Sequence, residues 1–329
     1  MEPLADFVAS AFALVPTGFE RGNRGALGRI WRLRTADRSY AVKELFAAST
    51  PDPRLVAAEV DVTARAAAAG VRVPLSHPAV DGSFVVPFDG RWVRVFDWLD
   101  LTPADLNAPE VATDLGRLLA RLHRSAPRST TEPDGSPPDP WFDVPPEPSW
   151  WVRWATAAAT SSAAGAAGSW TARLAESVPR LEHLTALAIP AWPPAMVICH
   201  RDLHPENVLA CDGTLAVVDW DNLGPAEPGR ELAKVLFDWF FAAGTLDRTG
   251  AGRFWTAYRE SGGPGRLAGT DDFGLLIAAR LNFLNRQIGI ALDHTVDSEH
   301  RAWALKEIDE ALTILPTPES FAEVLDLVA

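Results

Sequence analysis

The residues most able to carry out chemistry lie in one short stretch of the chain, residues 197–223, which reads VICHRDLHPENVLACDGTLAVVDWDNL. Asp202 follows an apolar run, Asn207 closes the polar loop after it, and Asp219 ends a later apolar run. An Asp-Gly pair lies between two short apolar segments, which is typical of a tight hairpin turn with positive φ. We therefore expect a small hairpin that carries Asp202, Asn207 and Asp219 to one end.

Two carboxylates and an amide at one point suit phosphoryl transfer. One carboxylate can orient an acceptor hydroxyl and take its proton, while hard oxygen donors hold Mg2+ on the phosphates. The order His-x-Asp, then Asn five residues after the Asp, then an Asp at the end of the next hairpin, is that of the catalytic core of kinase-like folds. An ordinary hairpin with surface acids would require several polar residues to coincide at fixed spacing, so we disfavour it.

HRDLHPENVL followed by VVDWD resembles the aminoglycoside phosphotransferase and choline kinase superfamily. The His-Pro pair and Asp-Trp-Asp, in place of Asp-Phe-Gly, favour these small-molecule kinases over protein kinases. The resemblance implies an α/β (α+β), two-lobed protein-kinase-like fold, with a small antiparallel-sheet N-lobe that has one helix and a larger, mainly helical C-lobe. It implies a nucleotide-binding lobe at residues 1–100. Residues 101–329 would then hold the catalytic loop, the metal site and the acceptor-binding helices.

The same resemblance implies the cofactors and the central roles. ATP, with GTP not excluded, would bind with Mg2+. Asp202 would be the catalytic residue that positions the acceptor hydroxyl, and Asn207 and Asp219 would hold the metal. Lys43, in an expected strand over residues 39–45, would hold the α and β phosphates. Lysine is scarce in this chain, which makes a lysine at a motif position more informative.

Further residues are assigned to the nucleotide site by the resemblance. Glu59, on a helix expected over residues 51–69, would pair with Lys43 and hold it toward the phosphates. That helix has a plausible N-cap at Asp52 and a stop at Gly70. The other assigned residues are Gly25 and Gly28 in a turn over the phosphates, Ala41 in the adenine pocket, Asp97 and Leu99 in the hinge, and Leu209.

Composition restricts the partners and the compartment. The chain has 329 residues and a net charge of −13, and an acidic surface repels nucleic acid and anionic membranes. Its N-terminus lacks the basic region of a signal peptide, and no apolar stretch is long enough to cross a bilayer. Two cysteines are more consistent with free thiols than with a disulfide framework. We expect a cytoplasmic protein, and the sequence leaves its oligomeric state open.

The acceptor is inferred from the distribution of charge. The first 100 residues carry no net charge, so the remainder carries the whole −13. This favours a small cationic acceptor in the second lobe, although a solvated outer surface explains any single acid equally well. The candidate contacts are Asp221, Glu227, Asp238, Asp271 and Asp272.

We expect a small-molecule kinase that transfers the γ-phosphate of ATP or another nucleoside triphosphate to a hydroxyl, with an aminoglycoside-type antibiotic phosphotransferase favoured. A metabolic kinase for choline, homoserine or a sugar is the alternative, and no motif separates the two. A nucleotide-binding pseudokinase is disfavoured because Lys43, Asp202, Asn207 and Asp219 are all present. A protein kinase is disfavoured because the chain after Asp219 is too short for an activation loop before the next helix.

Apolar spacing predicts the helices of the second lobe. The expected helices cover residues 109–124, 230–241, 271–292, 298–315 and 318–328. A tryptophan cluster, Trp141, Trp150, Trp151, Trp154 and Trp170, could stack a sugar ring or cage a cation. We favour the simpler interpretation that these residues anchor a loop onto the helical core.

Overall fold

The computed structural model describes residues 3–24, 28–46, 51–129, 141–160, 168–189, 196–242 and 244–329. It consists of two compact units, residues 1–127 with 200–224 and residues 128–199 with 225–329. The expected mixed kinase-like fold with an antiparallel N-terminal sheet is confirmed. The units do not coincide with lobes divided at residue 100, because residues 101–127 and 200–224 belong to the same unit as the sheet. That residues 1–100 bind the nucleotide and residues 101–329 hold the catalytic loop and the acceptor stays a prediction.

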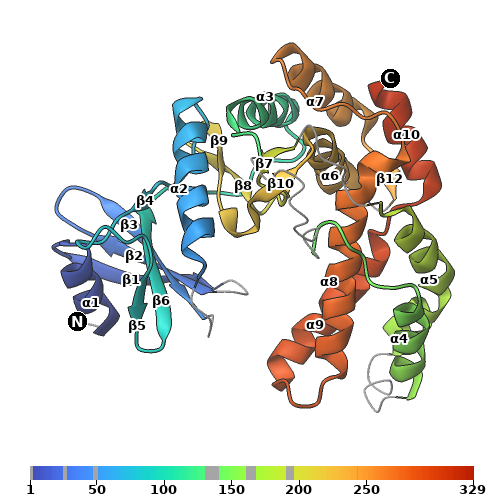
Figure 1. Cartoon of the computed structure of the whole chain (residues 1–329), viewed down its shortest axis with the longest axis horizontal. Helices are drawn as coiled ribbons and strands as arrows, with labels where there is room; N and C mark the ends of the chain where they lie inside the picture. The colour runs from blue at the N-terminus through green and yellow to red at the C-terminus, as the bar shows by residue number, and fades with distance from the viewer. Residues whose placement is uncertain are drawn as a thin grey trace. The chain divides into compact units, whose positions relative to one another are not determined.

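The first unit is built on a six-stranded antiparallel sheet in the order β1-β2-β3-β6-β4, with β5 also paired to β6 (Figure 1). Its strands are β1 (Gly18–Arg24), β2 (Gly28–Arg34), β3 (Ser39–Leu45), β4 (Ser76–His77), β5 (Val86–Phe88) and β6 (Arg91–Asp97). Side chains alternate between the two faces of a strand, so Val42 and Lys43 on β3 point to opposite faces. The register places Lys43 opposite Arg94 of β6, which brings these two basic residues to the same face.

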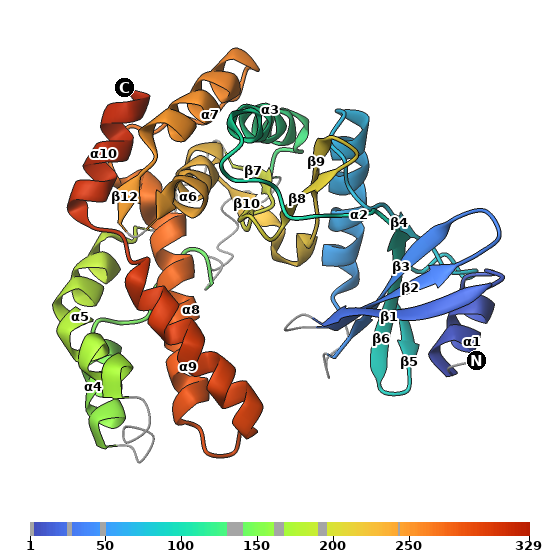
Figure 2. The ribbon, with the colours of Figure 1, turned by 180° about the vertical axis from the view of Figure 1, so that it is seen from behind.

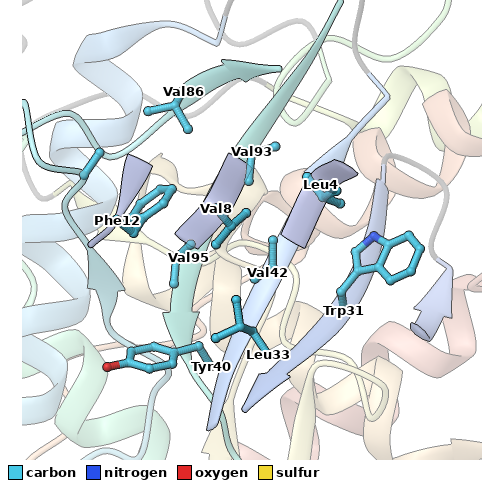
Figure 3. Packing of buried hydrophobic residues seen from close by; sticks show 11 residues of the cluster. Leu4, Val8, Phe12, Trp31, Leu33, Tyr40, Val42, Val86, Val93 and Val95 are labelled. Carbon is cyan, nitrogen blue, oxygen red and sulfur yellow. The ribbon is translucent and has the colours of Figure 1, made fainter. Parts of the chain in front are cut away.

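The face that carries Val42 is covered by helix α1 (Pro3–Ala11), which the sequence analysis does not predict. In Figure 3, Leu4 and Val8 of α1 lie over Val42, Val93 and Val95 of the sheet. Each of these five side chains is buried. This apolar layer leaves the opposite face, with Lys43, for polar chemistry.

Helix α2 (Pro53–Ala68) is bonded to the opposite face through its Glu59 side chain. It begins as predicted, because the Asp52 side chain accepts a hydrogen bond from the backbone N–H of Arg54 and a proline occupies the first turn. It also ends as predicted, at Gly70, whose φ of 81° is the left-handed conformation that glycine adopts without strain. Helix α3 (Pro109–Ser125) contacts α2.

The predicted hairpin is present, as β8 (Val208–Cys211) paired with β9 (Thr214–Val217). Asp212 and Gly213 at its turn have φ values of 48° and 76°, as a two-residue turn with positive φ requires. The hairpin is attached to the rest of the first unit by isolated bridges from Arg72 to Ala216 and from Thr102 to Ala210. A 3-10 helix, η2 (Trp220–Asn222), follows β9 after Asp219.

The second unit is mainly helical, and its later helices begin and end close to the predicted positions. Helices α8 and α9 run side by side, as do α4 and α5 (Figure 2). The helices are α4 (Ser149–Thr160), α5 (Gly168–Leu187), α6 (Pro228–Phe240), α7 (Arg248–Glu260), α8 (Gly274–Leu292), α9 (Ser298–Thr313) and α10 (Pro318–Val328), with η3 (Thr270–Phe273). The short strands are β7 (Val197–Cys199), β10 (Gly224–Ala226), β11 (Phe241–Ala242) and β12 (Thr245–Leu246).

Part of the tryptophan cluster belongs to the core of the second unit. Trp151 is fully buried and donates a hydrogen bond to Thr185 Oγ1 (2.9 Å), and Trp170 is also buried. Trp154 donates to Asn285 on α8 (2.7 Å), while Trp150 is exposed. Of the helices that the structure describes, none combines the length and the apolar character that a bilayer span requires.

Candidate active site

The candidate site lies within the first unit and centres on the ammonium group of Lys43. Its Nζ lies 3.0 Å from Asp219 Oδ1 and 2.7 Å from Asp221 Oδ2. Lys43 is near the middle of β3, and both acids belong to the turn that follows β9. The fold therefore joins a strand lysine to two carboxylates that lie more than 170 residues later in the chain.

The environment of Lys43 keeps it charged. Burial by itself lowers the pKa of Lys43, but the charges of Asp221 and Asp219, and their hydrogen bonds, raise the pKa above its ordinary value. The group is consequently an ammonium ion at neutral pH.

The predicted ion pair between Lys43 and Glu59 is wrong. Glu59 instead makes a bidentate pair with Arg94, with Arg94 Nη1 at 2.6 Å from Oε2 and Nη2 at 3.0 Å from Oε1. Arg94 also donates to Ser76 Oγ (3.1 Å), and the side chains of both Glu59 and Arg94 are buried. The physical reason is the register of the sheet, which places Arg94 directly beside Lys43 and gives Glu59 a cation with two parallel donors.

Asp202 and Asn207 are held together by the loop between them. Asn207 Nδ2 donates to the backbone carbonyl of Asp202 (2.9 Å), and its backbone carbonyl accepts from the N–H of Val218 (3.0 Å). The carboxylate of Asp202 accepts a hydrogen bond from Asn222 Nδ2 at Oδ2 (3.0 Å). His204 Nε2 lies 3.7 Å from the same oxygen. The hairpin thus links the expected catalytic carboxylate to the residues expected to bind the metal.

Two residues of the site have backbone conformations that are uncommon outside glycine. Arg201, which directly precedes Asp202, has φ 67°, and Asp219 has φ 59°. Left-handed conformations of this kind cost on the order of 1–3 kcal/mol and persist where the surrounding contacts enforce them. The strain therefore lies beside the two carboxylates to which we assign the chemistry.

His200 has a structural environment. It is buried, its Nε2 donates to the backbone carbonyl of Val218 (3.0 Å), and its Nδ1 accepts from the N–H of Asp202 (3.3 Å). Its ring packs against Trp220, with centroids 4.7 Å apart. Both ring nitrogens of His200 are therefore bonded to the backbone, at Asp202 and next to Asp219.

The other residues assigned to the nucleotide site are distributed over the same unit. Gly28 is required by close packing, because a Cβ there would lie 2.5 Å from the carbonyl oxygen of Glu44. Gly25 lies outside the described residues. Ala41 is on the Lys43 face of β3, Leu209 is half-buried on β8, and Asp97 ends β6.

The hinge segment borders a pocket. It has a volume of about 480 Å³ and is lined by Arg32, Arg38, Ser39, Arg72, Val73 and residues 97–100. The backbone N–H of Asp97 is already bonded to Leu75 O (2.9 Å), and its carboxylate contacts His77 Nε2 (2.7 Å). Of the two residues assigned to the hinge, Leu99 is therefore the better candidate to donate its backbone N–H to the nucleobase.

The residues expected to bind the acceptor differ in their partners and in their burial. Asp221 holds Lys43, so it belongs with Asp219 rather than with an acceptor. Asp238 is a wrong assignment, since both of its oxygens are bound inside the second unit, to Lys234 (2.6 Å) and to Arg280 (2.9 Å). Burial raises the pKa of Asp238, but these two cations hold it below its ordinary value. Asp238 is therefore part of a buried structural ion triad.

The remaining three acceptor candidates lie in the second unit. Burial raises the pKa of Glu227 above its ordinary value; Arg230 opposes the shift, and Asp272 and Asp143 add to it. Asp272 accepts hydrogen bonds from the N–H groups of residues 268 and 269, and Asp271 is exposed. Glu227 therefore lies near one cation, Arg230, and near two acids. The three residues stay candidates.

Two residues that make these contacts, Arg94 and Asn222, are not among those predicted from the sequence. A charged residue between Val93 and Val95 in the middle of a strand was a signal for Arg94, because a buried charge requires a partner. Asn222 gave no comparable signal. It lies three residues after Asp219 in a polar segment, and only the folded turn brings its amide to Asp202.

A six-stranded antiparallel sheet, a strand lysine, and a hairpin that carries Asp202, Asn207 and Asp219 define the class of kinase-like phosphotransferases. The chain belongs to the phosphotransferase enzyme family (APH), whose family model matches residues 18–269. It is therefore a phosphotransferase. A search of curated protein sequences gave no significant match.

Several solved structures share this fold at low sequence identity. A spectinomycin phosphotransferase in complex with ADP and spectinomycin is 12% identical, with a TM-score of 0.66 over 98% of this chain and 96% of that chain. An amicoumacin kinase in complex with AMP-PNP, Ca2+ and Ami is 15% identical, with a TM-score of 0.61 over 98% and 96%. A microcompartment-associated aminopropanol kinase is 19% identical, with a TM-score of 0.62 over 94% of each chain.

Proposed function

We propose that the protein transfers the γ-phosphate of ATP, or of another nucleoside triphosphate such as GTP, to a hydroxyl of a small cationic molecule. An aminoglycoside-type antibiotic is the favoured acceptor, in which case the protein would act in antibiotic resistance. The observation that carries the proposal is the assembly of Lys43, Asp202, Asn207 and Asp219 in one compact unit. The spectinomycin and amicoumacin kinases that share the fold support the choice of acceptor class.

The donor atoms of the site fit Mg2+. Asp219 and Asp221 supply carboxylate oxygens around a single cationic atom, Lys43 Nζ. Asn207 uses its Nδ2 to bind the Asp202 carbonyl, so its amide oxygen is the atom suited to a metal. Hard oxygen donors of this kind are the ligands that Mg2+ takes beside phosphates. When bound, Mg2+ would neutralise charge on the transferring phosphate, and Lys43 would bind the phosphates.

Asp202 is assigned to the acceptor hydroxyl. In the transfer, the acceptor oxygen forms a bond to the γ-phosphorus while the bond from that phosphorus to the β,γ-bridging oxygen breaks, and the nucleoside diphosphate leaves. The hydroxyl proton passes to Asp202. Asn207, bonded to the backbone carbonyl of Asp202, holds the loop that presents this carboxylate.

A metabolic kinase for an amino alcohol such as choline, or for homoserine or a sugar, is the second candidate. The observation that favours it is the likeness of the fold to an aminopropanol kinase. Aminoglycosides and amino alcohols are both hydroxylated cations at neutral pH, so the acidic composition of the chain suits both. A cytoplasmic location, where ATP is made and used, is part of either proposal.

The test is a screen of nucleotide consumption. Purified protein is incubated with Mg2+ and either ATP or GTP, together with a panel of aminoglycosides, spectinomycin, aminopropanol, choline, homoserine and neutral sugars. We expect acceptor-dependent release of the nucleoside diphosphate with at least one cationic hydroxylated compound, and its loss in Asp202→Asn. Turnover with neutral sugars alone would overturn the cationic acceptor, and nucleotide binding without turnover on any acceptor would favour a pseudokinase.

A further inference from the structure

Three consecutive residues of the catalytic loop each bind the segment that carries the metal-binding acids. His200 donates to the carbonyl of Val218 (3.0 Å), and Arg201 Nε donates to the carbonyl of Asn222 (2.7 Å). Asp202 accepts a hydrogen bond from the side chain of Asn222 (3.0 Å). The loop and the segment are therefore joined by two backbone contacts and by one contact that reaches the catalytic carboxylate itself.

The Asn222 side chain is held in place from behind. It ends the 3-10 helix that begins directly after Asp219, and its backbone carbonyl is bound by the buried guanidinium of Arg201. Gly224 leaves room for that guanidinium, because a Cβ there would lie 2.3 Å from Arg201 Cζ. Arg201 also donates to the carbonyl of Leu223 (3.3 Å). These contacts fix the backbone of Asn222, and so they fix the position from which its side-chain amide extends.

We propose that Asn222 is a positioning residue for phosphoryl transfer, which acts by fixing the carboxylate of Asp202. This inference rests on the proposed function. The terminal torsion of an aspartate has a broad distribution, so a donor bound to one of its oxygens narrows the orientation of the carboxylate. The N–H of Asn222 holds Oδ2, so it sets the plane in which Asp202 meets the acceptor hydroxyl. The same turn carries Asp219 and Asp221. The hydrogen bond from Asn222 therefore also fixes the distance between the carboxylate of Asp202 and the carboxylates of Asp219 and Asp221.

The expected cost of losing this hydrogen bond is a slower chemical step. Displacement of a catalytic group by about 1 Å can reduce a rate by about 10²-fold. Nucleotide binding is assigned to Lys43 and Asp219. Among the described contacts, the Asn222 side chain is bonded to Asp202 and to neither of these two residues. The effect should therefore fall on kcat and spare the KM for ATP. A merely structural role would lower stability and affect both constants.

The variant that removes the donor at nearly constant side-chain size is Asn222→Asp, and Asn222→Ala removes it without adding charge. Asn222→Asp keeps the size of the side chain and the backbone carbonyl that Arg201 binds; it replaces the N–H donor by an oxygen and adds a negative charge beside Asp202. Asn107→Asp is the matched control, since it makes the same chemical change at an exposed position of the same unit. The probe is ATP with Mg2+, with water as the acceptor and with any acceptor that the screen identifies.

For Asn222→Asp we expect kcat to fall about 10- to 100-fold. We expect the KM for ATP to stay within about twofold, and the unfolding temperature to match that of Asn107→Asp. Asn222→Ala, which removes the donor without adding charge, must show the same separation of kcat from KM. Wild-type kcat in a folded Asn222 variant would overturn the positioning role and leave the proposed function intact.

A double-mutant cycle tests whether Asn222 acts through Asp202. In the Asp202→Asn background, measured by single-turnover transfer of labelled phosphate, Asn222→Ala should lower the residual rate no further. The same fold loss in both backgrounds would overturn the proposal, because Asn222 would then act elsewhere. If wild-type protein transfers phosphate neither to water nor to any acceptor, the proposed function fails, and the positioning role fails with it.

Discussion

At the scale of single residues, each charged side chain assigned to the site is bonded to a group of the protein itself. Lys43 is bonded to Asp219 and Asp221, while Asp202 is bonded to Asn222. A metal would bind the carboxylates and the phosphates would bind the lysine, so the two ligands together would replace these ion pairs. Each residue therefore has a separable role, which substitution can test.

Asp202→Asn should lower turnover by about 10²–10⁴-fold, because the amide cannot take the acceptor proton. Nucleotide affinity should change little, since Lys43 and Asp219 are intact. Steady-state kinetics and calorimetric titration with a non-hydrolysable ATP analogue measure the two effects. Wild-type turnover in this variant would contradict the role of Asp202.

Asp219→Ala and Lys43→Ala should have different effects on nucleotide binding. The first removes a charged oxygen donor, so binding should lose its dependence on Mg2+. The second removes a phosphate contact, so binding should weaken and stay dependent on Mg2+. Titration of each variant with and without Mg2+ separates these cases, and identical behaviour of the two would show that the assignment is wrong.

At the scale of elements, helix α2 is joined to the sheet by the buried pair of Glu59 and Arg94. This pair differs from the expected contact in one important respect. It involves no group that we assign to the phosphates, so the attachment of α2 and the charge state of Lys43 are independent within this unit. Asp219 and Asp221 supply the neutralisation of Lys43 that Glu59 was expected to give.

Glu59→Ala should lower the free energy of unfolding by about 3–5 kcal/mol, because it leaves the buried guanidinium of Arg94 without its partner. Nucleotide affinity should be retained in the folded protein. Urea denaturation followed by circular dichroism gives the first quantity, and calorimetric titration gives the second.

The control for this variant is Asp61→Ala on the same helix. Asp61 forms an exposed pair with Arg65, so its loss should leave the free energy of unfolding nearly unchanged. If Glu59→Ala abolishes nucleotide binding without loss of stability, Glu59 acts on Lys43 after all.

At the scale of the whole molecule, the net charge of −13 is unevenly distributed along the chain. One acid that appeared available, Asp238, is buried in a triad with Lys234 and Arg280, so it adds nothing to the surface field. Glu227, Asp271 and Asp272 are the candidates that stay. A field from such acids would steer a cation inward at low ionic strength.

The kcat/KM for a cationic acceptor should therefore fall as salt rises, since the screening length is about 10 Å at 0.1 M ionic strength. A neutral hydroxylated compound of similar size provides the comparison and should show no such trend. The measurement is a series of initial rates at a saturating ATP concentration. A preferred acceptor that is neutral or anionic, with kcat/KM indifferent to salt, would contradict the electrostatic argument.

Much of this protein could be predicted from local sequence. The cap at Asp52, the stop at Gly70, the Asp-Gly turn, and the helices after residue 270 depend on a few neighbouring residues, and each is present in the structure. The motif from His200 to Asp221 also predicted the class of enzyme, because phosphoryl transfer requires carboxylate and amide groups of these types at this spacing.

Only the tertiary structure decided which charges meet. Arg94 takes Glu59 because of the register between β3 and β6, and Lys43 takes Asp219 and Asp221 because a strand and a distant turn pack together. Asn222 reaches Asp202 through the closure of a turn. Each pairing depends on positions separated by many residues, and local residue preferences contain no information about which of several equally charged partners lies within reach.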